Sequence, residues 1–177
     1  MNRWLLGVVV GVPLLLGTAT AQGGRGAAES APPEMMFIDG AKNPELIPQW
    51  SAWGYAFRVI SGGPRELPSI VHKVVSADER AMIIKEADAV QKIDKACTEL
   101  LLKQHTVIGR GNLEALDAKL REITVACRQK TLDARNRILA ALNPDGATAL
   151  IMFVESTKEG TSLTIRKRDL PRFLEPE

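Results

Sequence analysis

Apolar side chains at helical spacing predict an amphipathic helix in the first third of the chain. Trp50, Trp53, Phe57 and Ile60 recur at intervals of three and four residues, which places them on one face of a helix. Glycines and a proline at residues 62–64 end this pattern. Because proline is tolerated in the first turn of a helix, two dipeptides can open it. They are Asn43-Pro44 and Ile47-Pro48.

Two longer stripes predict an antiparallel helical hairpin. Ser76 and Glu79 have the spacing of a capping box, so a helix should begin there and run to about Gln104. Residues 106–111 then form a short connection, and Asn112 can cap a second helix. Each helix has about 28–31 residues and is roughly 40–45 Å long at 1.5 Å per residue. The apolar positions are Ile83, Ala87, Val90, Ile93, Cys97 and Leu100 in the first helix and Leu113, Leu116, Leu120, Ile123, Cys127, Ala134 and Ile138 in the second.

The C-terminal part of the chain predicts a shorter helix and an irregular tail. Asn143 and Pro144 combine a capping asparagine with a proline at the first helical position, and an apolar stretch follows at residues 147–154. Gly160 ends this helix. Residues 162–165 alternate like a strand, but with only one candidate strand in the chain we expect no sheet. The predicted fold class is all-α: an elongated antiparallel helical hairpin with an N-terminal aromatic helix and a shorter C-terminal helix packed on it.

The first residues have the pattern of a secretory signal peptide. Arg3 precedes an apolar run at residues 5–17, which Pro13 interrupts and which is shorter than the roughly 20 apolar residues of a membrane span. Ala19 and Ala21 supply small side chains for the protease, so we expect cleavage after Ala21. The alternative is an uncleaved anchor. Export places the protein in a bacterial periplasm or outside the cell, with no stable membrane span after cleavage.

The rest of the chain divides into a leader and a domain. Residues 1–21 are the expected signal peptide, and residues 22–34 contain no large apolar side chain. Such a segment cannot offset its own ordering entropy, so we expect a flexible leader. The composition changes at Met35, and residues 35–177 are expected to form a single helical domain.

The charge pattern excludes one class of partner. The 23 basic and 21 acidic residues are interspersed, with a formal net charge of +2. Binding to nucleic acid needs clustered cations, so nucleic acid is not an expected partner. The one dense basic run is Arg166-Lys167-Arg168 with Arg172 nearby. It is either a solvated tail or a contact with anionic lipid or cell-wall polymer.

Residues that carry chemistry are scarce. The chain has two histidines, two cysteines and one tyrosine, and it contains no His-x-x-x-His, Glu-x-x-His or Cys-x-x-Cys spacing for a metal. His72 and His105 are each interpreted as structural or surface residues, with a metal or proton role as the alternative. The prediction is a protein that is not an enzyme, with no catalytic residues, no metal and no cofactor.

The two cysteines fall on apolar stripes and, after export, meet an oxidising compartment. If the hairpin turns near residue 109, Cys127 is offset from the position opposite Cys97 by roughly 6 residues, or 9 Å along the axis. That offset exceeds the separation that a disulfide tolerates, although an asymmetric loop or a bend would recover it. Three alternatives stay open: a disulfide between Cys97 and Cys127, two buried thiols, or a redox role.

The aromatic stripe has two interpretations. Trp50, Trp53 and Phe57 are either core residues or, where their helix does not dock fully on the hairpin, a partner surface.

The layout of the chain resembles that of the Spy and CpxP type of small periplasmic stress proteins. These are exported, all-helical and cysteine-poor, and they have two Leu-Thr-x-x-Gln helix starts. The comparable segments are Val75-Ser76-Ala77-Asp78-Glu79 and Leu142-Asn143-Pro144-Asp145-Gly146, which also start helices after an apolar residue but contain neither the threonine nor the glutamine. Separately, residues 39–48 are similar to a segment of uncharacterised exported bacterial proteins.

These observations lead to three functional hypotheses. The first is a non-enzymatic exported binding or chaperone-like protein that presents amphipathic helices to a protein or cell-envelope partner. The second is a structural or assembly module that forms a homodimer through the long hairpin. The third is a metal-binding protein or an enzyme.

Overall fold

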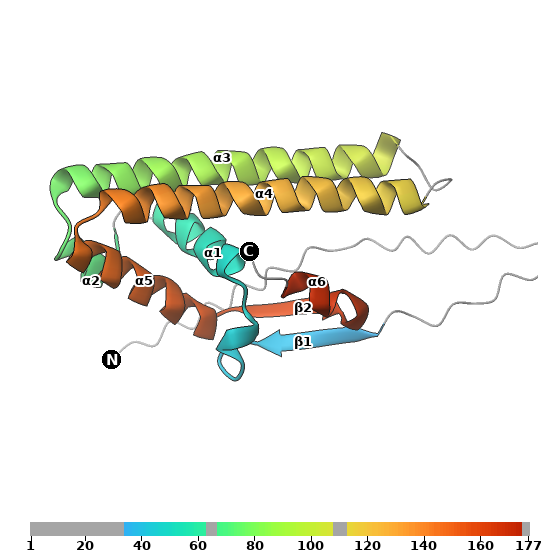
Figure 1. Cartoon of the computed structure of the whole chain (residues 1–177), viewed down its shortest axis with the longest axis horizontal. Helices are drawn as coiled ribbons and strands as arrows, with labels where there is room; N and C mark the ends of the chain where they lie inside the picture. Colours follow the sequence, from blue (N-terminus) through green and yellow to red (C-terminus); the bar gives the residue numbers. More distant parts are fainter. Residues whose placement is uncertain (1–33, 63–66, 108–112, 175–177) are drawn as a thin grey trace, which may run out of the picture.

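The computed structural model describes residues 34–62, 67–107 and 113–174, and these residues are mostly helical (Figure 1). The predicted all-α class is therefore confirmed. The signal peptide, the leader up to residue 33 and Asn112 lie outside the described residues. The elements are β1 (Met35–Asp39), η1 (Pro44–Leu46), α1 (Gln49–Gly62), α2 (Ser69–His72), α3 (Ala77–Val107), α4 (Leu113–Ala141), α5 (Pro144–Glu159), β2 (Ser162–Arg166), η2 (Lys167–Asp169) and α6 (Leu170–Phe173).

The two longest helices, α3 and α4, lie side by side over most of their length (Figure 1). Glu86 forms an ion pair with Arg137, and Cys97 forms a disulfide with Cys127. The partner's number falls on α4 as the residue number rises on α3, so the two helices are antiparallel. Helix α3 continues to Val107, beyond the predicted end.

The core lies at one end of this helix pair, where α1 packs against α3 and α4 and α5 packs against α1 and α2 (Figure 1). Phe57 and Ile60 of α1 are fully buried there, together with Ile83 of α3 and Ile138 of α4. Each large apolar side chain removed from water in this way contributes about 1.5–3 kcal/mol. Burial of these positions explains why the helical spacing was visible in the sequence.

Capping residues define the starts of α3 and α5 as predicted. The Ser76 hydroxyl accepts the N–H of Glu79 at 3.2 Å, and the Glu79 carboxylate accepts the N–H of Ser76 at 2.7 Å. Asn143 accepts the N–H of Gly146 at 2.8 Å, with Pro144 at the first helical position. Both proline signals before α1 are also used, because Pro44 opens η1 and Pro48 precedes α1.

The prediction that no sheet can form is wrong. β1 pairs with β2 in an antiparallel ribbon whose register runs from Met35 opposite Arg166 to Asp39 opposite Ser162. The sequence pattern missed β1 because residues 35–38 are all apolar and show no alternation of apolar and polar positions. Its partner strand is also distant in the sequence, so no local signal joins the two.

The C-terminal tail is not irregular either. After β2 it forms the 3-10 helix η2 and the short helix α6 (Figure 1). Phe173 of α6 contacts Trp50 of α1 and Arg128 of α4. Pro171 fits the first turn of α6, a signal that the sequence analysis did not use. Because α6 contacts α4, the basic run at the end of β2 and in η2 lies next to α4.

Candidate functional site: an exposed strand edge

The aromatic stripe belongs mainly to the core. Trp53 is 2% exposed and Phe57 is 0% exposed, so the interpretation of these two residues as a partner surface is wrong. Their helix docks fully on α3, α4 and α5, which leaves those rings no access to a partner.

Trp50 has a different environment from the rest of the stripe. Its ring meets the ring of Phe173 edge to face at 5.5 Å, and the guanidinium of Arg128 lies 4.1 Å from its centroid. A cation above an indole face is attracted by the ring quadrupole. These three residues therefore join α1, α4 and α6, and Trp50 is partly covered by residues of the chain itself.

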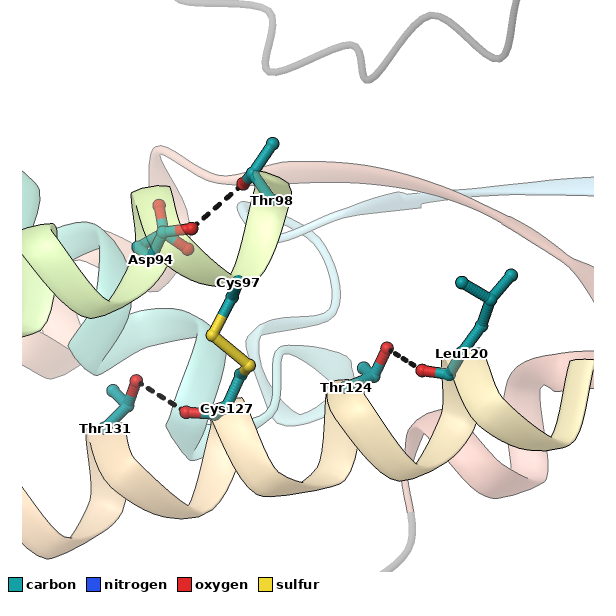
Figure 2. The surroundings of a disulfide bond; sticks show 7 residues. All are labelled: Asp94, Cys97, Thr98, Leu120, Thr124, Cys127 and Thr131. Carbon is teal, nitrogen blue, oxygen red and sulfur yellow. Dashed lines mark hydrogen bonds between the residues drawn. A yellow bond between two sulfur atoms is a disulfide. The ribbon is translucent and has the colours of Figure 1, made fainter. Parts of the chain in front are cut away.

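Cys97 and Cys127 form a disulfide between α3 and α4 (Figure 2). Their Cα atoms are 6.4 Å apart, so the expected 9 Å offset is wrong and no buried free thiol exists at either position. The assumed turn position gave the wrong register. The ion pair of Glu86 with Arg137 lies within one residue of the register of the disulfide, so both contacts belong to one alignment of α3 and α4.

A polar cluster locks the starts of α3 and α5 together. The carboxylate of Glu79 accepts the N–H of Ser76 and, at 2.7 Å, the N–H of Asn143. The Asn143 side chain also donates to the carbonyl of Val74 at 3.1 Å. These hydrogen bonds, first that from Ser76 and then that from Asn143, lower the pKa of Glu79 to about 2. The cluster is a structural joint, because each donor is part of the chain's own backbone or capping groups.

The histidines are not brought together with other metal ligands in the described part of the chain. His72 is exposed at the end of α2. His105 lies in α3, and its side chain is outside the part of the chain that the structure describes. Among the described residues, no group of three or more His, Cys, Asp or Glu side chains could hold a metal ion. None of the helices described is long and apolar enough to cross a membrane.

The most exposed large apolar side chain described is on β1, not on a helix. Phe37 is 65% exposed and Met35 is 53% exposed, while Ile38 on the opposite face is 1% exposed. The face of the ribbon that carries Met35 and Phe37 therefore points to solvent. Ile38 faces the core, which fixes the orientation of the strand.

The backbone N–H and C=O groups of Met35 and Phe37 point away from β2. At the two ends of the ribbon, Lys167 N–H donates to Glu34 and Gly40 N–H donates to Thr161, each at 2.9 Å. Hydrogen-bonded residues alternate along an antiparallel strand, so the N–H and C=O groups of Met35 and Phe37 face the outer edge of β1. No other described strand pairs with this edge, and Figure 1 shows no helix on its outer side.

A glycine holds the ribbon against α5. A Cβ on Gly40 would overlap the carbonyl oxygen of Lys158, so only glycine allows this close approach between the end of β1 and the end of α5. Together with the buried Ile38, this contact fixes the position of β1 relative to α5 and the core. We call Met35, Phe37 and the outward backbone groups of β1 the β1 edge.

Sequence reasoning missed the β1 edge. The available signal was the run of four apolar residues at 35–38, which directly follows a segment without large apolar side chains. A short apolar run of this kind is compatible with a strand, and a second candidate strand at residues 162–165 was already visible.

Comparison of the chain with protein-family models, curated proteins and solved structures finds no match. The resemblance to the Spy and CpxP type stays a prediction.

Proposed function

We propose that the chain is a non-enzymatic, exported, chaperone-like binding protein that receives an extended apolar segment of a protein partner along the β1 edge. The observation that carries this proposal is the coincidence of two features at Met35 and Phe37. Their side chains are more than half exposed, and their backbone groups face an edge that no described strand covers.

The backbone groups favour an extended partner. A strand edge presents N–H and C=O groups at the spacing of another strand, so it pairs with a chain that is itself extended. Such main-chain hydrogen bonds do not depend on the partner's sequence. They suit a protein that binds many partly unfolded chains.

The side chains favour an apolar partner. Methionine is flexible and fills irregular gaps, and phenylalanine offers a large area for burial. Met35 and Phe37 lie two residues apart on one face, as do alternate side chains of a bound strand. The two positions therefore fit a segment with apolar residues at alternate positions.

The experiment is the suppression of client aggregation. Citrate synthase denatured in guanidinium is diluted into buffer with equimolar protein, and light scattering is followed with time. Phe37→Pro removes the outward N–H and the exposed ring, while the hydrogen bonds to β2 are made by the neighbouring residues. Leu102→Ser is the matched control, because Leu102 is 63% exposed but lies on α3.

The proposal expects suppression by the wild type and by Leu102→Ser, and loss of suppression in Phe37→Pro. Circular dichroism checks that both variants remain folded. Suppression that survives Phe37→Pro, or no suppression by the wild type, contradicts the proposal. A wild-type dimer that Phe37→Pro converts to a monomer, without any effect on the client, assigns the β1 edge to a second copy of the chain instead.

A second candidate is a structural module that forms a homodimer through α3 and α4. The observation in its favour is the exposure of Leu102 at 63% and of Val125 at 61% on these two helices. Sedimentation velocity at micromolar concentration tests it. A wild-type dimer that Leu102→Ser dissociates supports the module, and a strict monomer contradicts it.

A further inference from the structure

A polar cavity lies between α4 and the C-terminal corner of the chain. Its volume is about 290 Å³, and it is lined by Asp117, Arg121, Arg166, Arg168 and Asp169. The two groups of residues are distant in the sequence. From the sequence, the basic run is either a solvated tail or a contact with anionic lipid or cell-wall polymer. In the structure Arg166 and Arg168 of this run line one wall of the cavity, opposite Arg121 of α4.

The lining has an excess of positive charge. Three guanidinium groups face two carboxylates, which leaves a formal charge of +1. Asp117 forms an ion pair with Arg121, and Asp169 forms ion pairs with Arg166 at 2.5 Å and with Arg168 at 3.9 Å. Each guanidinium has five N–H donors, of which a carboxylate uses at most two. The carboxylates thus orient the arginines and leave donor capacity for a ligand.

The two walls are held in place by contacts outside the cavity. Asp117, Arg121 and Arg128 are spaced by four and seven residues, so they lie on one face of α4. Arg128 stacks on Trp50, and Trp50 meets Phe173 of α6, which follows η2 directly. This stack keeps the C-terminal corner beside α4.

We propose that this cavity binds a compact phosphate-class anion. Arginine forks match phosphate oxygens, and guanidinium groups from two walls can surround a tetrahedral group better than a planar one. The volume corresponds to the liquid volume of about ten water molecules. It therefore accommodates a phosphate group with several atoms of its ester, as found in a soluble phosphate ester or in a lipid headgroup.

The inference is independent of the β1 edge, and its test uses other variants. The full mature chain, labelled with ¹⁵N, is titrated with inorganic phosphate and with glycerol 1-phosphate while the backbone and guanidinium resonances are recorded. A second arm measures flotation of the protein with vesicles of phosphatidylcholine that contain phosphatidylglycerol. Arg121→Gln removes one donor group, and Arg58→Gln is the matched control.

The control removes the same charge at a distant place. Arg58 of α1 pairs with Asp94 and has a side-chain exposure of 47%, against 49% for Arg121. We expect saturable shifts at Arg121, Arg166 and Arg168 with a dissociation constant of about 1 mM. Arg121→Gln should weaken binding about tenfold, and Arg58→Gln should leave it unchanged.

A third variant changes the affinity in the opposite direction. Asp117→Asn raises the formal charge of the lining and should tighten glycerol 1-phosphate binding several-fold, an effect that misfolding would not produce. Binding of glycerol 1-phosphate without flotation supports the cavity and indicates a soluble ester, and binding in both arms supports it and indicates a headgroup. Absence of saturable shifts, equal weakening by Arg121→Gln and Arg58→Gln, or flotation without binding of the soluble ester overturns the proposal.

Discussion

The carboxylate of Glu79 accepts the backbone N–H of Asn143 at 2.7 Å, across 64 positions of sequence. The same carboxylate caps its own helix through Ser76, so one side chain satisfies the starts of both α3 and α5. Asn143 in turn caps α5 through Gly146. Two local capping motifs are therefore joined into a single connection between distant helices.

This connection predicts a pH-dependent contribution to stability. The folded-state pKa of Glu79 is about 2, below its usual value of 4.5. The contribution is therefore fully present above pH 4.5 and is lost as the pH falls from there towards 2. Glu79→Gln should lower the melting temperature at pH 7, and the difference from the wild type should shrink as the pH falls.

Thermal melts by circular dichroism between pH 7 and pH 2 provide the measurement. Glu99→Gln, on the exposed side of α3, is the control and should leave the profile unchanged. A difference between wild type and Glu79→Gln that stays constant across this range would show that the carboxylate charge is not what joins the helices.

The disulfide should stabilise the α3–α4 pair. A bridge over a sequence separation of 30 contributes about 3.6 kcal/mol, chiefly by restricting the unfolded chain. Cys97→Ser with Cys127→Ser should lower the melting temperature by roughly 7–14 °C. Melts with and without reductant give the measurement: the wild type should respond to reductant and the double variant should not. An equal melting temperature for the wild type and the double variant, both without reductant, would contradict the assigned bridge.

The aromatic helix provides a core prediction. Trp53→Ala removes a ring that is 2% exposed, and truncation of a packed aromatic costs about 3–5 kcal/mol. Val59→Ala is the control on the same helix, because Val59 is 43% exposed and its truncation should cost about 0.5 kcal/mol or less. Urea unfolding of the three proteins measures the free energies. Similar values for the two variants would mean that α1 does not dock as described.

The helical part of the fold was predictable because its signals are local. The capping box at Ser76 and Glu79, the Asn143-Pro144 start and the apolar stripe through Phe57 each depend on residues within one or two turns. Helix starts and buried faces need only that range of sequence. Their agreement with the structure follows from this locality.

The missed features all depend on pairing between distant segments. β1 is a strand because it pairs with β2, and the cavity forms because Arg121 of α4 and Arg166 of the C-terminal corner lie close together. The predicted register of Cys97 and Cys127 was wrong because it was derived from an assumed turn position. The sequence does not show how the two helices align. No short pattern encodes such alignments, so the candidate sites could not be built from the sequence alone.

The central claim is that the β1 edge receives an extended apolar segment, and amide hydrogen exchange tests it most directly. The probe is carboxymethylated α-lactalbumin, which stays unfolded without reductant and so leaves the Cys97–Cys127 bridge intact. Exchange at individual amides is followed by NMR with and without the probe. The account predicts new protection at the N–H groups of Met35 and Phe37, with the amides of Met36 and Ile38 already protected by β2. Protection confined to α3 and α4, or no new protection on β1, would contradict it.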